Sequence, residues 1–99
     1  MDDLDIRLEE SEHGMVLRLT GTLDGHTALA VTQALRELPP LPLIVDFSQV
    51  RTFVDLSVDA LTRALRDRPV SLTGLGRHQA RMFRYFGLRT DEVEQPAEA

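Results

Sequence analysis

The sequence has 99 residues with a net charge of −5, and 42% of the residues are hydrophobic. This length gives one domain with one core, and the composition is typical of a folded domain. The absence of cysteine excludes disulfides, thiolate metal sites and cysteine nucleophiles. All 11 basic residues are arginine, which excludes a P-loop and a lysine Schiff base, and the acidic balance disfavours nucleic-acid binding.

The location of the protein is expected to be the cytoplasm, without direct membrane insertion. No apolar run approaches the roughly 20 residues that a membrane-spanning helix needs. The opening residues, MDDLDIRLEE, are acidic, whereas a secretory signal peptide begins with basic residues.

The first two elements are predicted to form an antiparallel hairpin. Residues 4–9 alternate apolar and charged side chains, and residues 15–19 alternate again after the turn sequence EHG. Period-two alternation indicates half-buried strands, and a short loop containing glycine is typical of a hairpin. The stretch GTLDG, residues 21–25, is expected to end the second strand and lead into a helix.

A helix is predicted from Thr27 to Leu38, because its apolar residues are spaced three, four and three apart and form one stripe. These residues are Ala28, Val31, Leu35 and Leu38. The prolines that follow end the helix. Residues 43–47, LIVDF, then predict a strand in a sheet that is covered on both faces.

A second helix is predicted after residues 52–54, a strand-type run that meets Asp55. Val58, Leu61 and Leu65 fall on one face of this helix. Such a junction between a strand and a helix leaves free backbone N–H groups, so it is a candidate site for phosphate or for a partner.

The remaining elements are a short strand over residues 70–74 and a third helix from about Arg77 to Phe86, with Gly87 as its C-cap. The order β-β-α-β-α-β-α predicts an α/β fold. Its mixed sheet has about four strands, an antiparallel hairpin followed by parallel strands, with three or more helices. Residues 1–90 are interpreted as one domain, and residues 91–99 as an acidic, flexible tail.

Three stretches in this order resemble the STAS domain family, which is named for sulfate transporters and anti-sigma factor antagonists. They are GTLDG at residues 21–25, VDFSQV at 45–50 and FVDLSVDAL at 53–61. The resemblance extends from the first strand to Leu88. It implies a module that binds a kinase-type anti-sigma factor and is switched off by phosphorylation.

The position of the phosphate acceptor departs from the family's pattern. The acceptor in the family is a serine or threonine directly after an aspartate, in a pattern like D-[ST]-[ST]-G. Here that aspartate matches Asp55, but Leu56 stands at the acceptor position, Ser57 matches the second hydroxyl and Val58 replaces the glycine. The sequence therefore predicts either a permanently binding-competent protein or one that is regulated elsewhere, with an exposed Leu56 that can anchor the partner. Ser57 is the remaining candidate for phosphorylation.

The predicted partner surface centres on the start of the second helix, the 21–27 loop and the exposed face of that helix. Its residues are Asp24, Asp55, Leu56, Ser57, Asp59, Thr62 and Arg63. Helix capping is the simpler explanation for Asp55, Ser57 and Asp24 when the family is left aside.

Asp46 and Ser48 match the family's D-x-S pattern and are expected at the carboxyl end of a buried strand, where α/β sheets commonly place ligands. A turn after the strand explains them equally well. Arg77, Arg81 and Arg84 share one face of the third helix, which is either a solvated face or a patch for an acidic protein surface.

No metal, cofactor or catalytic function is expected. The histidines His13, His26 and His78 have no metal-ligand spacing. A triad of Ser57, His26 and either Asp24 or Asp55 lacks the G-x-S-x-G elbow.

The leading role is an anti-sigma factor antagonist that binds a serine-kinase-type anti-sigma factor. The first alternative is a structural STAS subunit that supports the ATPase of an ABC transporter of the lipid-asymmetry type. The second is a sensor that binds a nucleotide or another anion at the helix start. If Asp24, Asp55 and Asp59 converge, they make this site acidic, which would disfavour the binding of an anion.

Overall fold

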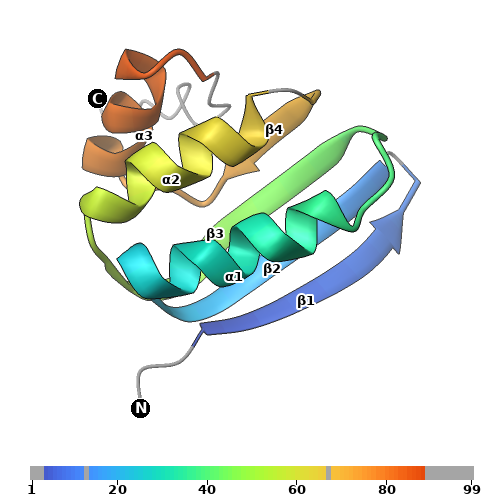
Figure 1. The fold of residues 1–99 in the computed structure, drawn as a ribbon, viewed down its shortest axis with the longest axis horizontal. Coiled ribbons are helices and arrows are strands. Elements are labelled where there is room, and N and C mark those ends of the chain that lie inside the picture. The colour runs from blue at the N-terminus through green and yellow to red at the C-terminus, as the bar shows by residue number, and fades with distance from the viewer. Residues whose placement is uncertain (1–3, 13, 67, 89–99) are drawn as a thin grey trace.

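The computed structural model describes residues 4–12, 14–66 and 68–88, and the predicted tail at 91–99 lies outside them. The strands are β1 (Leu4–Ser11), β2 (Gly14–Leu23), β3 (Leu43–Phe53) and β4 (Val70–Thr73). The helices are α1 (Gly25–Arg36), α2 (Leu56–Leu65) and α3 (Arg77–Tyr85). Their order along the chain is the predicted one (Figure 1).

The described strands form one mixed sheet in the order β1-β2-β3-β4. β1 and β2 pair antiparallel, with Ile6 opposite Leu19, while β2, β3 and β4 run parallel. This arrangement confirms the predicted fold class, including the hairpin that precedes the parallel strands.

The helices α1 and α2 lie across the same face of the sheet, and α3 lies beside α2 (Figure 1). Each parallel crossover moves one strand further in the same direction, so two right-handed crossovers place both helices on one side. Leu43, Val45 and Phe47 are buried on that side, while Ile44 and Asp46 are only half-buried. The prediction that this strand is covered on both faces is therefore wrong. Ile44 is instead shielded by its cross-strand neighbour Val16.

β3 does not end near Asp46 and Ser48, as predicted, but continues to Phe53. The β2–β3 register shifts between Arg18 and Thr20, where β3 contains an extra residue. At this bulge the Ser48 backbone N–H donates to the Asp46 carboxylate at 2.9 Å, and Arg18 binds the same carboxylate at 2.7 Å. Asp46 and Ser48 thus stabilise a bulge within a strand and do not form a ligand edge.

Gly74, which follows β4, holds the chain close to this bulge. Its φ is +76°, and a Cβ atom there would lie 2.5 Å from the Ser48 backbone nitrogen. Both the backbone angle and the close approach require glycine at this position.

The core lies between the helices and the sheet. The α1 stripe is buried as predicted at Ala28, Val31 and Leu35. At the end of the sheet, Phe83 of α3 packs against Phe47 and Phe53 with ring centroids 5.8 and 6.3 Å apart. This aromatic cluster attaches α3 to the segment of β3 that leads into α2.

The turn after α3 confirms the predicted glycine C-cap. Gly87 has a φ of +100°, and its N–H donates to the Arg84 carbonyl. The Leu88 N–H donates to the Phe83 carbonyl, which closes the helix end.

Candidate functional site

The starts of α1 and α2 lie side by side at one end of the sheet. The Val54 N–H donates to the Leu23 carbonyl at 2.8 Å, so the β3–α2 junction is hydrogen-bonded to the end of β2. The Leu56 Cδ2 atom lies 3.7 Å from the position that a Cβ on Gly25 would take. The two loops that carry the family's motifs thus form one surface, as the sequence predicts.

Asp24 caps α1. Its Oδ1 atom accepts hydrogen bonds from the His26 and Thr27 backbone N–H groups at 3.0 and 2.8 Å. The Thr27 hydroxyl in turn accepts from the Asp24 N–H at 2.9 Å, which completes a capping box. The capping interpretation of Asp24 is confirmed, and the first N–H groups of α1 are satisfied within the chain.

The cap also lowers the pKa of Asp24, first through the hydrogen bond from the Thr27 backbone and then through those from the Thr27 hydroxyl and the His26 backbone. Since the carboxyl pKa is lower in the folded state than its ordinary value of 3.8, the cap stabilises the fold above that value. The contribution is lost as the pH falls through the lowered pKa.

Replacing Asp24 with asparagine is expected to keep the cap, because asparagine is an equally good N-cap, but to remove the titration. The melting temperature of Asp24→Asn should therefore fall less than that of the parent protein between about pH 5 and about pH 2. Asp24→Ala should lower the melting temperature by a few degrees at neutral pH. Equal acid sensitivity of the parent and Asp24→Asn would show that Asp24 does not titrate with folding.

Asp55 does not cap α2, contrary to the simpler sequence interpretation. It has helical backbone angles and makes no side-chain hydrogen bond to the helix start. Its carboxylate instead contacts His78 Nε2 on α3 at 3.1 Å, and both side chains are more than half exposed. Asp55 therefore links the start of α2 to the start of α3.

Ser57 and Thr62 do not lie on the surface. Ser57 is 0% exposed, and its hydroxyl donates to the Val54 carbonyl at 2.7 Å, which closes the first turn of α2. Thr62 is 1% exposed, so its assignment to the exposed face of the helix is wrong. In a helix, residues four apart share a face, and Thr62 falls on the same buried face as Val58. A kinase could reach Ser57 only after this turn of α2 had opened.

Leu56 is the most exposed side chain at the junction, with 71% of its surface in contact with solvent, and Val54 beside it is 38% exposed. Asp59 and Arg63 are exposed one and two turns further along α2 and form an ion pair at 3.3 Å. Asp24 is bonded to the start of α1, Asp55 to His78, and Asp59 to Arg63, so the surface offers an apolar anchor beside carboxylates that have partners within the chain.

The three aspartates do not converge on one point. Asp24 bonds to the start of α1, Asp55 contacts α3, and Asp59 pairs within α2. Within the described part of the chain, no three acidic or imidazole side chains are placed to share a metal ion, and His13 lies outside that part.

The residues of the proposed triad are not assembled. Ser57 donates to a backbone carbonyl, and the histidine beside Asp55 is His78 and not His26. Arg77, Arg81 and Arg84 are exposed on α3, opposite the buried Phe83.

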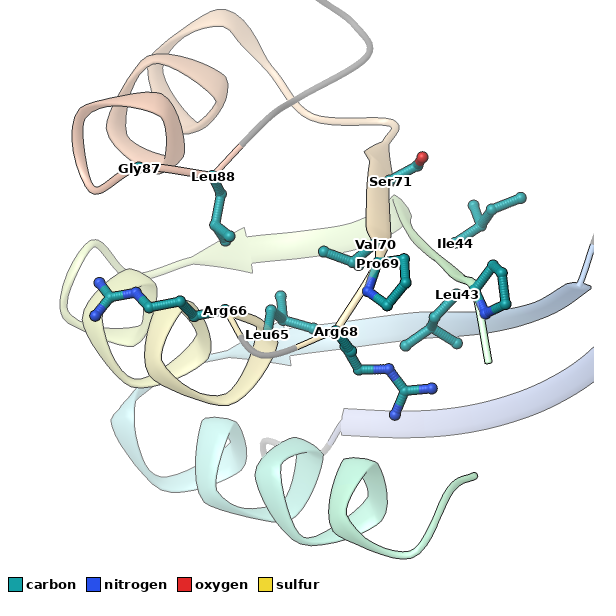
Figure 2. A pocket seen from close by; sticks show the side chains of 11 residues that line it. Leu43, Ile44, Leu65, Arg66, Arg68, Pro69, Val70, Ser71, Gly87 and Leu88 are labelled. Carbon is teal, nitrogen blue, oxygen red and sulfur yellow. The ribbon is translucent and has the colours of Figure 1, made fainter. Parts of the chain in front are cut away.

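A hollow lies at the end of α2 that is remote from Leu56, next to β3 and β4 (Figure 2). It has a volume of about 560 Å³, and apolar side chains from β3, β4, α2 and the end of α3 face it. They include Leu43, Leu65, Val70 and Leu88. Arg66 and Arg68 extend away from its centre (Figure 2). Its polar lining residues are Arg66, Arg68 and Ser71.

Sequence reasoning missed two contributors to the site. Gly25 lies next to the Leu56 side chain, and His78 reaches Asp55 from a helix more than 20 residues away. Gly25 could have been found from the sequence, because it directly follows Asp24 in the GTLDG stretch. Nothing local signals the second, because it depends on how α3 packs.

Comparisons with known proteins agree with this fold. A family model described as "Mlab, STAS domain" matches residues 6–94. An anti-sigma factor antagonist from Mycobacterium paratuberculosis has a similar solved structure, with a TM-score of 0.69 and 20% identity, covering 96% of this chain and 85% of that one. A STAS-domain antisigma-factor antagonist from Rhodobacter sphaeroides has a TM-score of 0.57 and 22% identity, covering 72% and 86%. No curated protein sequence matches the chain. None of the described helices is both long and apolar enough to cross a membrane.

Proposed function

Because the chain belongs to the STAS family described as "Mlab, STAS domain", we propose that it is a protein-interaction module that docks on one protein partner through the Leu56 surface. The observation that carries this proposal is the exposure of Leu56, 71%, at a helix start whose one nearby hydroxyl, Ser57, is buried. An exposed leucine surrounded by polar groups is suited to fill a pocket on a protein.

The first candidate for the partner is a serine-kinase-type anti-sigma factor. Support comes from the similarity of the fold to two solved anti-sigma factor antagonists. By analogy with that role, docking occludes the sigma-binding surface of the anti-sigma factor and releases sigma. In this role the chain acts only by binding the anti-sigma factor and covering its sigma-binding surface, so the mechanism needs no cofactor in this chain.

The second candidate is the ATPase subunit of an ABC transporter of the lipid-asymmetry type. Two observations favour it. The matching family model is described by the name Mlab and not by an anti-sigma role. In addition, Leu56 stands where a regulated antagonist carries its phosphate acceptor, and a constitutive structural subunit has no need of an acceptor.

A ligand sensor is supported less well. An anion at the start of α2 would need free backbone N–H groups, but those of Ser57 and Val58 donate to the carbonyls of Val54 and Asp55. The negative charge of the Asp55 carboxylate would also repel the anion.

The two protein partners are distinguished by titrating the purified chain against each protein in a calorimeter. The proposal expects saturable binding to one of them at a ratio of one to one, with the anti-sigma factor as the first expectation. Binding to the ATPase alone would select the second candidate. The absence of binding to either protein, in the presence and absence of ATP, would contradict the proposed function.

Phosphorylation is not expected to regulate the chain. Leucine has no oxygen to modify, and the Ser57 hydroxyl is enclosed and hydrogen-bonded to Val54. Incubation with ATP and the kinase-type anti-sigma factor should leave the intact mass unchanged. The gain of one phosphate per chain, mapped to Ser57, would show instead that the first turn of α2 opens and that the surface is switched.

A further inference from the structure

A groove between α1 and α2 continues the Leu56 surface towards the other end of the helices. We call it the α1–α2 groove, and it is lined among others by Leu29, Arg36, Ala60, Arg63, Ala64 and Arg68. Its volume is about 620 Å³. Leu56 rests against Gly25 at the first turn of α1, and Leu29 lies one turn further along the same helix.

The floor of the groove is apolar. Leu35 is buried beneath it, Ala60 and Ala64 are half-buried, and Leu29 leaves 62% of its surface in solvent. The Thr32 hydroxyl donates to the Ala28 carbonyl at 3.0 Å, so this polar side chain is satisfied by its own helix. A partner in this groove therefore meets hydrocarbon along its centre.

The rim of the groove is cationic, although the chain as a whole has a net charge of −5. Among the described residues, Arg36, Arg63 and Arg68 line it, together with one carboxylate, that of Asp59. The Asp59–Arg63 pair is more than half exposed on both sides, so it costs little to exchange for a partner's carboxylate. The local excess of positive charge selects an acidic occupant.

Arg68 is held in place at one end of the groove. Its Nη2 atom donates to the carbonyls of Pro39 and Leu41 at 2.7 and 2.8 Å. Among the described residues, its buried Nε atom has no hydrogen-bond partner. A guanidinium that is already fixed loses little conformational entropy when it binds a carboxylate.

The dimensions favour a helix as the occupant. The 12 residues of α1 extend over about 18 Å, which matches about three turns of a second helix. A small anion is disfavoured because it would leave the apolar side chains that line the groove, among them Leu29, Ala60 and Ala64, uncovered. Laying the apolar stripe of an amphipathic helix into such a groove is a common mode of peptide recognition.

We propose that the α1–α2 groove binds an acidic amphipathic helix of the protein partner, with apolar residues along Leu29, Ala60 and Ala64 and carboxylates against Arg36, Arg63 and Arg68. This inference rests on the proposed function in taking the partner to be a protein. It adds that the partner carries an acidic amphipathic helix next to the pocket that receives Leu56.

The probe is a synthetic peptide of about 18 residues, long enough to form a helix, with leucines three and four apart and glutamates beside them. Its control has lysines in place of the glutamates. Titrated into the ¹⁵N-labelled full chain, the glutamate peptide should shift the amide signals of Leu29, Ala60 and Ala64. The affinity should fall as salt rises from about 0.05 to about 0.5 M.

Charge-reversal variants identify the arginines that bind the carboxylates of the peptide. Arg36→Glu and Arg63→Glu should each weaken binding of the glutamate peptide about threefold to tenfold, and Arg81→Glu on α3 should change it less than about twofold. All three residues are exposed and the change in charge is the same, so Arg81→Glu is a matched control. Equal binding of the lysine peptide, or a loss with Arg81→Glu as large as with Arg36→Glu, would overturn the proposal.

The same variants separate this inference from the proposed function. If Leu56→Asp weakens binding of the natural partner and Arg36→Glu does not, the groove proposal fails and the docking surface stands. If neither variant affects a partner that binds, both fail, because the partner then docks elsewhere.

Discussion

Replacing Leu56 with aspartate is expected to weaken partner binding about 30-fold or more, corresponding to about 2 kcal/mol, and to leave the free protein as stable as the parent. The side chain is 71% exposed in the free chain, so its removal creates no cavity in the core. In a complex, an aspartate there would bring a charge into the partner's apolar pocket without a counter-ion. Calorimetric titration measures the affinity, and urea unfolding measures the stability.

Leu8→Asp is the matched control for this experiment. Leu8 is also a half-exposed leucine, 48% in solvent, but it lies on β1 at the far edge of the sheet. The Leu8→Asp variant should bind the partner with an affinity within about twofold of the parent's, as expected for surface changes outside the interface. An unchanged affinity in Leu56→Asp would place the interface elsewhere on the molecule.

Replacing Phe83 with alanine is expected to have the largest effect on stability, with a loss of about 3–5 kcal/mol in the free energy of unfolding. Phe83 is 0% exposed and packs against both Phe47 and Phe53. A domain of this size has a total stability of only about 5–15 kcal/mol, so a large fraction would be lost. Since α3 carries His78, its contact with Asp55 should weaken as well.

A milder variant keeps this prediction testable if Phe83→Ala does not fold. Phe83→Leu should cost less than about 1.5 kcal/mol, because leucine refills part of the volume. Tyr85→Ala on the same helix should cost within about 0.5 kcal/mol, since Tyr85 is 85% exposed. A loss below about 1 kcal/mol for Phe83→Ala in urea unfolding would contradict the role of the aromatic cluster.

The fold was predictable from the sequence wherever the signal is local. The alternation in residues 4–9 and the apolar stripe of α1 each depend on one element alone, and the strand and the helix that they predict are confirmed, although Leu8 of the strand is exposed. The strand at Leu43 was assigned the wrong environment, because a run of apolar residues does not reveal that Ile44 is only half-buried, in register with Val16 of the neighbouring strand. The bulge after Asp46 was hidden for the same reason, since it exists only in the pairing with β2.

The candidate site was predictable in part. Gly21–Gly25 and residues 53–56 do lie together, and Leu56 is exposed as expected. Ser57 and Asp55 were both predicted at the surface or as helix caps, but Ser57 is buried and the Asp55 side chain does not cap α2. Serine faces the interior because its hydroxyl can satisfy the Val54 carbonyl there, and Asp55 is drawn outward to His78. The angle at which α2 leaves the sheet decides this, and single-residue preferences do not specify it.

The environment of the Leu56 methyl groups tests the docking surface most directly. In methyl NMR with a soluble paramagnetic probe, their signals should broaden strongly in the free protein and be protected in the saturated complex, while the Leu8 methyls broaden equally in both. Leu56 methyls that broaden as strongly in the complex as in the free chain would contradict the account.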